Sequence, residues 1–536
     1  MFVRVKRAGG HEYLQLAENR WVDGRSRQRI IATLGRLDRL QASGQVEVLL
    51  HSLGRFSDKV QVEQAHAQGD LEALSIRHVG PALVFGRLWK KLQLDRILNE
   101  LVAERRFSFD VERAIFSTVL HRLFESGSDR QGLQFFRGVG VPGSDELELH
   151  HLYRAMHWLG ENKDVVEERL FAAHRDLFTQ LRLVFFDTTS FYFEGEGGEE
   201  LGQYGHSKDH RPDRRQVVVG ALLTQTGRPL SCTVEPGNKA DVKALLPVVD
   251  RARERFGLTE VCFVADRGMV SREVIEALER REMGYILGMR MRSVKEIREQ
   301  VLGHPGRYQK VADNLRVKEV RITNRRYIVC HNPSQAKKDA KDRTAIVEML
   351  ERKLKGGAKA MIGNRGFRRY LSAEKGAVRL DSKRIEAEAR YDGKWVLRTN
   401  IDLPAEDVAQ QYKQLLRVER LFRSAKSLLQ TRPIYHRLDT TITGHIFCSF
   451  LALLLMHELN EQIRQRGEHL EWADILRDLS ALEEVEVRHN DTHYILRSPV
   501  HGVCGKVFQA AGVAIPPSVR QTDPSAKTDI RGSECP

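Results

Sequence analysis

The chain has 536 residues, with 86 Lys and Arg against 72 Asp and Glu, and a formal net charge of +14. This length predicts more than one domain core, and the positive charge favours binding of a polyanion, nucleic acid first, without separating DNA from RNA. Six cysteines with no CxxC pair, no signal-peptide core and no apolar run of membrane length argue against a zinc ribbon, a disulfide framework and a membrane span, and predict a soluble, cytoplasmic protein.

The first 181 residues divide into two parts. Residues 1–80 begin with strand-like FVRVKR and YLQLAENRWVDGRSRQRIIATLG, with a probable hairpin turn at Asp23 and Gly24, and are interpreted as a small β-rich lobe. Residues 81–181 show 3.6-residue periodicity in four stretches and predict a helical domain. Its cations are consistent with a DNA-binding domain, although a solvated helix face would look the same: Lys90, Lys91, Arg105, Arg106, Arg113 and Arg122.

Residues 182–290 alternate in a specific order. Three strand-like runs, LRLVFFD, QVVVGALLT and RPLSCTVEP, are followed by a helix, the strand EVCFVAD, a helix and the strand GYILGM. This order predicts a mixed α/β sheet, in which ligands favour the carboxyl ends of strands. Asp187 and Asp266 are each expected at such an end.

The remaining chain is expected to interrupt and then complete this sheet domain. Residues 291–400 are interpreted as a β-rich insertion subdomain, including a hairpin that turns at Asp392 and Gly393. Residues 401–460 return to the domain of residues 182–290, with a helix from Pro404 to about Gln430. Residues 461–515 are predicted to be a helical or mixed region, and residues 516–536 a disordered tail.

Three acids, Asp187, Asp266 and Glu419, form the main candidate site. Two metal ions about 3.5 to 4 Å apart can activate one oxygen and stabilise another in phosphodiester chemistry, and such ions prefer carboxylate ligands. The alternative is that Asp187 starts a turn, Asp266 caps a helix, and Glu419 pairs with Arg423 on an exposed helix. The common sheet of the two aspartates and the setting of Glu419 favour the metal site.

Glu419 lies in a helical run in which Tyr412, Glu419 and Lys426 recur every seven residues, on nearly one face. Arg423 is one turn after Glu419 and points the same way. One helix edge would therefore present a carboxylate for metal beside cations for DNA phosphate.

These residues resemble the DDE transposases of bacterial insertion sequences, in particular the group with a Tyr-x2-Arg-x3-Glu-x6-Lys signature. The pattern falls on Tyr412, Leu415, Glu419 and Lys426, so that Leu415 replaces the signature arginine and Arg417 is the nearest upstream cation. Other similar stretches lie within roughly 183–455: GHSKDHRPD from Gly205, PGNKAD from Pro236, ADRGM from Ala265, and RPIYHR followed by GHIF from Arg432.

The resemblance implies a ribonuclease-H-like catalytic domain with a β-rich insertion, and two Mg²⁺ or Mn²⁺ ions held by Asp187, Asp266 and Glu419. It also implies cleavage of terminal inverted repeats and joining of the 3′-OH ends to target DNA, in a homodimeric synaptic complex associated with the bacterial nucleoid. Tyr412, Arg423 and Lys426 would contact the DNA backbone.

Three further residues are candidate DNA contacts. Lys208 and Arg211 lie in a basic polar loop that suits phosphate better than zinc, despite its two histidines. Trp395 on the insertion hairpin would stack on a base, and the alternative is that it packs on its own sheet without contacting DNA. Two rival functions stay open: a structure-specific DNA endonuclease of the same fold, and a non-catalytic regulator derived from a transposase.

Overall fold

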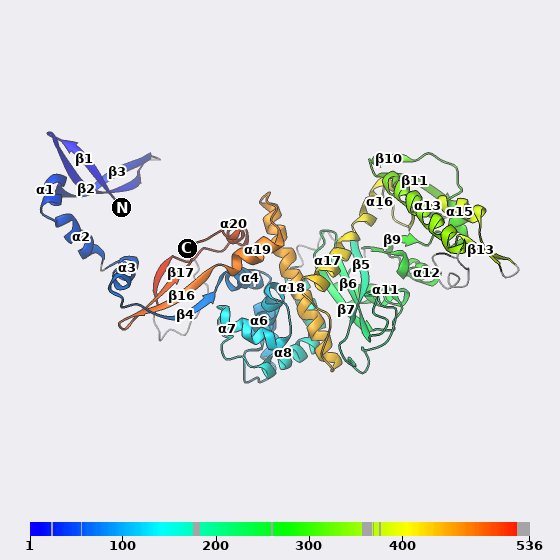
Figure 1. The fold of residues 1–536 in the computed structure, drawn as a ribbon, viewed down its shortest axis with the longest axis horizontal. Coiled ribbons are helices and arrows are strands. Elements are labelled where there is room, and N and C mark those ends of the chain that lie inside the picture. Colours follow the sequence, from blue (N-terminus) through cyan, green and yellow to red (C-terminus); the bar gives the residue numbers. More distant parts are fainter. Residues whose placement is uncertain are drawn as a thin grey trace.

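The structure is a computed structural model that describes residues 1–22, 25–54, 56–174, 183–258, 261–355, 367, 369–374 and 377–522. The described residues form a mixed α/β protein with strands in four sheets (Figure 1). The predicted α/β class is therefore confirmed at this level. The domain boundaries expected from the sequence stay predictions.

The N-terminal region holds an antiparallel three-stranded sheet, β1-β2-β3, at the left end of the molecule in Figure 1. Strands are confirmed where the alternating sequence predicted them, while Asp23 and Gly24 of the expected turn lie outside the described residues. Three helices and a fourth strand follow, so the first 80 residues are less uniformly β than expected. The elements are β1 (Phe2–Ala8), β2 (His11–Val22), β3 (Arg25–Arg36), α1 (Leu37–Ala42), α2 (Gln45–Gly54), α3 (Asp58–Gln68) and β4 (Glu72–His78).

The next region is helical, as the 3.6-residue periodicity predicts. The first periodic stretch forms two helices, α4 and α5, and α7 lies outside the four periodic stretches. The helices are α4 (Gly80–Lys91), α5 (Leu94–Val102), α6 (Val111–Phe124), α7 (Asp129–Gly138), α8 (Leu149–Glu161) and α9 (Lys163–Ala173).

A long helix from the far end of the sequence, α18 (Asp439–Gln465), packs into this helical region against α6 and α8. Two glycines allow the close approach, because a Cβ at Gly160 or Gly444 would lie within 2 Å of a carbonyl of the facing helix. By length and composition α18 could cross a membrane, but 83% of its most apolar window is buried inside the protein. It is therefore the central core helix.

The largest sheet has nine strands in the order β10-β11-β12-β15-β9-β8-β5-β6-β7. The strands β5, β6 and β7 pair antiparallel, whereas β8 and β9 run parallel to β5, in the chain order expected from the sequence. Its first elements are β5 (Leu183–Tyr192), β6 (Gln216–Thr224), β7 (Pro229–Pro236), η1 (Asp241–Lys243), α11 (Leu245–Phe256), β8 (Cys262–Ala265), η2 (Arg267–Met269), α12 (Arg272–Arg280) and β9 (Gly284–Met289).

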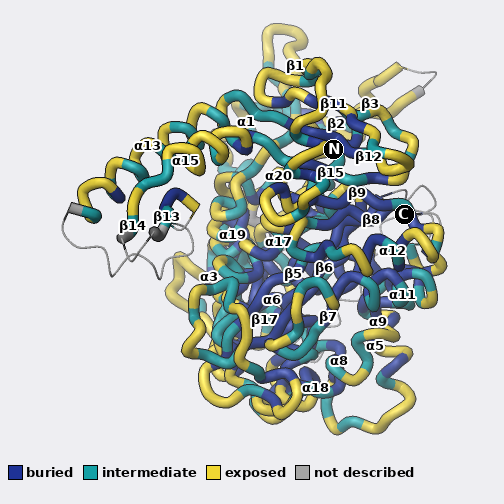
Figure 2. The backbone as a smooth tube through the Cα atoms, turned by 90° about the vertical axis from the view of Figure 1, so that its right-hand side faces the viewer, coloured by how far each residue is buried: buried dark blue, intermediate teal, exposed yellow. Residues whose placement is uncertain are grey.

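Both faces of this sheet are covered. Along β5, Phe185 belongs to the core that includes α18, whereas Phe186 belongs to the core that includes α11 and α12. Successive side chains of a strand point to opposite faces, so an apolar run without polar alternation suits a sheet buried on both sides. Figure 2 shows β5, β6, β8 and β9 as the dark blue centre of the molecule.

The insertion differs in two ways from the sequence-based expectation. Four of its strands belong to the nine-stranded sheet rather than to a separate one. The expected hairpin at Asp392 and Gly393 is wrong, because the helix α15 stands where its first strand was expected. The side chain of Asp381 caps that helix by accepting a hydrogen bond from Arg384 N. The elements are η3 (Ile297–Val301), β10 (Gln309–Ala312), β11 (Leu315–Ile322), β12 (Arg325–His331), α13 (Pro333–Lys355), β13 (Leu371–Glu374), β14 (Ala377–Leu380), α15 (Ser382–Ala389) and β15 (Lys394–Thr399).

The C-terminal region folds back on the N-terminal one through the sheet β18-β17-β16-β4. The expectation of a disordered tail is wrong for its first part, because β18 pairs with β17, and residues 523–536 lie outside the described residues. The remaining elements are α16 (Ala405–Lys413), α17 (Leu416–Ser427), α19 (Trp472–Ser480), β16 (Glu483–His489), β17 (Thr492–Arg497), α20 (Cys504–Ala511) and β18 (Val519–Thr522).

Candidate active site

Asp187 and Asp266 occupy corresponding positions on two neighbouring segments of the sheet. The last paired residues of the parallel strands β5 and β8 are Phe186 and Ala265, so each aspartate is the next residue along the chain. Neighbouring strands are about 4.8 Å apart, which brings the two aspartates close together at the carboxyl end of β8, between interior strands of the sheet. Asp266 follows the end of β8 as expected. Asp187 does not end its strand, which continues to Tyr192 and pairs Asp187 with Ala221 of β6.

The roles offered by the alternative interpretation do not fit these positions. Asp187 is inside a strand and starts no turn. The cap of α12 is Ser271, whose hydroxyl accepts a hydrogen bond from Val274 N, so Asp266 is not needed there. Neither aspartate therefore has the turn or capping role that this alternative assigns to it.

The surroundings of Asp187 make its ionisation costly. Burial raises the pKa of its carboxyl to about 6, and the nearby carboxylates of Asp266 and Asp241 act in the same direction. The ammonium of Lys208 and a hydrogen bond of 2.7 Å from Thr188 N oppose this rise in the pKa. Crowded, partly buried carboxylates of this kind are typical of functional sites.

Tyr412, which stays a predicted DNA contact, holds Asp266 in this structure. Its hydroxyl donates a hydrogen bond of 2.8 Å to Asp266 Oδ1. Burial and the Asp266 carboxylate both raise the pKa of Tyr412, so the hydroxyl stays a donor. Gly288 on β9 makes room for this contact, because a Cβ there would lie 2.3 Å from the hydroxyl. Tyr412 thus fixes the orientation of one site carboxylate.

The single helix expected from Pro404 to Gln430 is two helices. It breaks after Lys413, and α17 begins at Leu416. Gln414 and Leu415 keep right-handed helical dihedrals and are joined by i to i+3 hydrogen bonds, so the chain direction is maintained through a tighter turn.

Glu419 lies on an exposed flank of α17, next to the buried stripe of Val418, Phe422 and Ala425. Seven residues earlier Tyr412 contacts Asp266, and seven residues later Lys426 contacts Asp209. The segment that carries Glu419 is therefore held before that residue by Asp266 and after it by Asp209.

Lys426 is tied to a carboxylate that the sequence did not single out. Its ammonium lies 2.7 Å from Asp209 Oδ1, and Arg432 Nε lies 3.3 Å from Asp209 Oδ2. The Asp209 side chain is only 4% exposed, so this is a largely buried ion pair. Burial lowers the pKa of Lys426, while Asp209 raises it.

Lys208, expected to contact phosphate, is enclosed by protein acceptors. Its ammonium donates to the carbonyl of Thr188 at 2.7 Å and to its hydroxyl at 2.8 Å, and lies 3.1 Å from Asp241 Oδ2. Asp241 also accepts a hydrogen bond of 2.8 Å from the Thr188 hydroxyl. Asp241 is the last residue of the PGNKAD stretch, whose resemblance was the only signal that could have identified it.

The other predicted DNA contacts have mixed settings. Arg211 pairs with Asp213 at 2.8 Å and lies over the ring of Tyr192. Arg423 is exposed, and no ion pair is found for it among the described residues. Trp395 is half-buried within β15, with Lys413 over its ring at 5.9 Å.

Arg417 does not take the place of the missing signature arginine. Its guanidinium donates to the carbonyl of Gln225 in the turn between β6 and β7, while Leu415 is buried in the core. The side chain of Arg417 is thus held at the turn between β6 and β7, whereas Asp266 follows the end of β8.

The carboxylates of Asp187 and Asp266 suit a hard divalent cation, since carboxylate oxygens are the preferred ligands of such a cation. However, the described part of the chain contains no group of three or more His, Cys, Asp or Glu arranged to hold a metal ion. A hollow of about 340 Å³ opens beside Asp266, and its lining includes Arg267, Arg290 and Arg292. Arg290 fixes the loop after Asp266 by donating to the carbonyls of Arg267 and Gly268.

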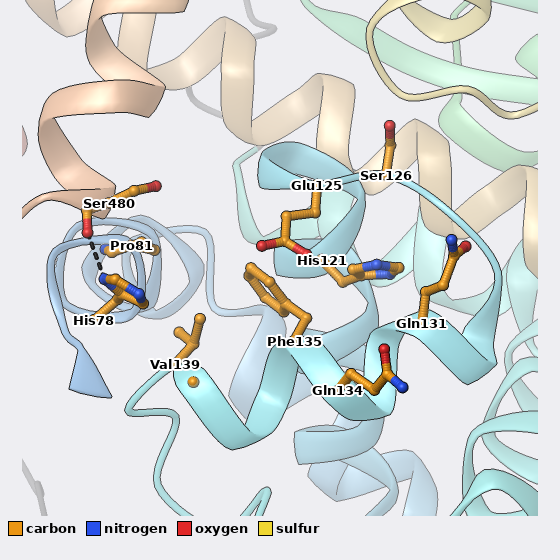
Figure 3. A pocket seen from close by; sticks show the side chains of 11 residues that line it. His78, Pro81, His121, Glu125, Ser126, Gln131, Gln134, Phe135, Val139 and Ser480 are labelled. Atoms are coloured by element: carbon orange, nitrogen blue, oxygen red, sulfur yellow. Dashed lines mark hydrogen bonds between the residues drawn. The ribbon is translucent and has the colours of Figure 1, made fainter. Parts of the chain in front are cut away.

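A separate cavity of about 370 Å³ lies between α6, α7 and the end of α19 (Figure 3). Its wall includes His78, His121 and Phe135, and His78 Nδ1 lies 2.6 Å from the carbonyl of Ser480. No predicted site residue lines it.

Comparison with protein families decides the identity of the chain. The family described as transposase DDE domain matches residues 179–455, just over half of the sequence. The chain belongs to the DDE transposases. Residues 2–66, from β1 into α3, match the N-terminal domain of IS1634 family transposases. A comparison with curated proteins found no match.

The matched region of this transposase extends from before β5 into α18 and includes Asp187, Asp266 and Glu419. The expected DNA transposase of an insertion sequence is thus confirmed, here of the IS1634 type. DDE transposases are metal-dependent enzymes of DNA cleavage and strand transfer.

Proposed function

We propose that this transposase cleaves the terminal inverted repeats of its own insertion sequence and joins the freed 3′-OH ends to target DNA. Both steps would be in-line phosphoryl transfers at the carboxyl end of β8, where Asp266 lies beside Asp187 of β5. The observation that carries the proposal is the adjacency of these two carboxylates, one of them oriented by Tyr412.

The sheet order supports a ribonuclease-H-like catalytic fold. Strands β7-β6-β5 form an antiparallel series, and β8 and β9 continue it parallel to β5. This arrangement brings the first carboxylate onto the central strand and the second to the end of its parallel neighbour. The helix α17, which carries Glu419, packs on β5 and β6.

Asp187, Asp266 and Glu419 would hold two Mg²⁺ ions, or Mn²⁺ in their place. When bound, these ions activate the attacking oxygen and stabilise the leaving oxygen. The chain itself would supply orientation: Tyr412 fixes Asp266, and Lys208 fixes the segment after Asp187. Arg267 and Arg292 beside Asp266 are suited to the phosphates of the DNA.

The test uses the full chain with DNA of the element end and Mg²⁺ or Mn²⁺. Asp187→Asn, Asp266→Asn and Glu419→Gln are each expected to reduce cleavage and joining by at least about a thousandfold and to leave DNA binding intact. Glu276→Gln is a matched control, because it removes an exposed carboxylate that pairs with Arg272 on α12. Cleavage by the Glu419→Gln variant at the wild-type rate would exclude Glu419 from the site.

The same assay separates the rival functions. A structure-specific endonuclease would cleave without joining ends to target DNA, and a regulator would bind without cleaving. Joining of two ends in one complex requires at least a homodimer, which the mass of the protein–DNA complex would reveal. We place this activity at the nucleoid of a bacterial cytoplasm.

A further inference from the structure

Two adjacent residues of the loop between β5 and β6, Lys208 and Asp209, contact the two elements that carry Asp187 and Glu419. The side chain of Lys208 contacts β5, which holds Asp187, and that of Asp209 contacts α17, which holds Glu419. Consecutive Cα atoms are about 3.8 Å apart. The strand and the helix are therefore linked through a single peptide unit of this loop.

Lys208 is held on β5 at two residues. Its ammonium donates to the carbonyl and the hydroxyl of Thr188, the residue after Asp187, and its backbone N–H donates to Ser190 Oγ at 2.8 Å. The Thr188 hydroxyl donates in turn to Asp241. Hydrogen bonds from both the side chain and the backbone thus set the position of Lys208 relative to Asp187.

The loop is also braced within itself. Ser207 Oγ accepts hydrogen bonds from Asp209 N at 3.3 Å and from Arg211 N at 3.0 Å. A serine hydroxyl that binds backbone N–H groups a few residues later in the chain restricts the backbone between them. The position of Lys208 on β5 therefore determines where Asp209 lies.

Asp209 holds α17 through Lys426. Its side chain is 4% exposed, and its Oδ1 lies 2.7 Å from Lys426 Nζ. Lys426 follows Glu419 by seven residues, which is about two turns or about 10.5 Å along the helix axis, on nearly the same face. The ion pair therefore restricts the rotation of α17 about its axis, and with it the direction in which Glu419 points.

A largely buried ion pair is a poor choice for stability alone. The cost of removing two charges from water offsets much of their attraction, and apolar side chains of similar size often give equal or greater stability. The buried face of α17 is already an apolar stripe of Val418, Phe422 and Ala425. Apolar packing is non-directional, whereas a hydrogen-bonded ion pair has a preferred geometry. The pair between Asp209 and Lys426 can therefore select one rotation of the helix among those that the stripe permits.

We propose that Asp209 is a positioning residue of this transposase: together with Lys208 it sets the position of Glu419 relative to Asp187, so that both carboxylates can hold the same metal ions. The described residues contain no ready group of three ligands, so the direction of Glu419 decides whether the acids meet. The inference rests on the proposed function, because it takes Asp187 and Glu419 as metal ligands.

The test measures Mn²⁺ binding to the full chain without DNA, from the electron paramagnetic resonance signal of the free ion, together with the Tm of each variant. Asp209→Glu keeps the charge and lengthens the side chain by one methylene, which changes the rotation of α17. It is expected to weaken Mn²⁺ binding by about 10- to 100-fold, the usual effect of changing a residue that orients a metal ligand.

The double variant Asp209→Asn/Lys426→Met separates positioning from stability. It removes both charges, so it is expected to have a higher Tm than Asp209→Asn alone, because the Lys426 ammonium is no longer left without its carboxylate partner. It is nevertheless expected to bind Mn²⁺ about 10- to 100-fold more weakly than the wild type, because the directional contact is absent. A pair that only stabilised the fold would give a recovered Tm with a recovered Mn²⁺ affinity.

Asp392→Glu is the matched control, because it makes the same substitution in another largely buried ion pair, that of Asp392 with Arg343 in the insertion. It is expected to bind Mn²⁺ like the wild type. Wild-type Mn²⁺ affinity in Asp209→Glu or in the double variant would overturn the positioning role. Asp187→Asn is measured alongside: if it too binds Mn²⁺ like the wild type, the metal site of the proposed function fails and this inference with it. A loss of binding in Asp187→Asn alone would refute the positioning role and leave the proposed function standing.

Discussion

Replacing Asp187 by Asn is expected to stabilise the metal-free protein. Burial raises the pKa of this carboxyl to about 6, against 3.8 for an unperturbed aspartate. A difference of about 2 pKa units corresponds to about 3 kcal/mol of folding free energy at a pH above both values. Asn keeps the size and the oxygen that accepts from Thr188 N, and it removes the repulsion from Asp266 and Asp241.

The effect depends on pH in a defined direction. Because the folded-state pKa lies above the unfolded value, protonation of Asp187 favours the folded state. The stabilisation from protonation is fully present below about pH 4 and is lost as the pH rises through about 6. The advantage of Asp187→Asn over the wild type is therefore largest above about pH 7 and disappears near pH 4.

The assay is thermal unfolding in a chelator at several pH values. If residues 179–455 unfold as one cooperative unit, a gain of about 3 kcal/mol raises its Tm by about 5 °C near neutral pH. Asp213→Asn is the control, because Arg211 lowers the pKa of that exposed carboxyl to about 2, so its removal brings no gain. An Asp187→Asn variant no more stable than the wild type near neutral pH, or a gain that does not shrink on acidification, would refute the reasoning.

Two other perturbations follow from the contacts around the site. Tyr412→Phe removes a charge-assisted hydrogen bond to Asp266 and is expected to slow cleavage by about 10- to 100-fold at unchanged DNA affinity; weaker DNA binding at an unchanged cleavage rate would show instead that Tyr412 contacts DNA. Asp209→Asn leaves the ammonium of Lys426 without its carboxylate partner and is expected to lower stability by about 3 kcal/mol, whereas Lys426→Met is expected to cost less, because Arg432 Nε still lies 3.3 Å from Asp209 Oδ2. The double variant is expected to lose less than the sum of the two single losses. Strictly additive losses in a thermal double-mutant cycle would mean that the pair is not coupled.

The order of strands and helices along residues 183–289 could be predicted because the apolar runs are long and bounded by turn residues. Asp266 was placed correctly, since β8 is short and ends at that residue. Asp187 was not, because its strand continues through polar TTS to Phe191 and Tyr192, held by pairing with β6. The partner strand is distant in sequence, and a local apolar run does not reveal how far the pairing extends.

The helix after Pro404 illustrates a second limit. Seven-residue spacing predicted one shared face for Tyr412, Glu419 and Lys426, but it did not reveal the break after Lys413. Nor did it reveal what two of these side chains contact, because Asp266 and Asp209 are more than 140 residues away along the sequence. Spacing defines a face, whereas the partner of that face is set by tertiary packing.

The same limit applies to the cations counted as DNA contacts. An ammonium has three N–H donors, and those of Lys208 are matched by the Thr188 carbonyl, the Thr188 hydroxyl and Asp241. A phosphate would have to displace one of these acceptors. Lys426 faces a similar requirement at Asp209. Arg423 carries no such ion pair in the described part of the chain and lies one turn from Glu419, so its guanidinium is the cation on this flank that can bind phosphate without first losing a protein partner.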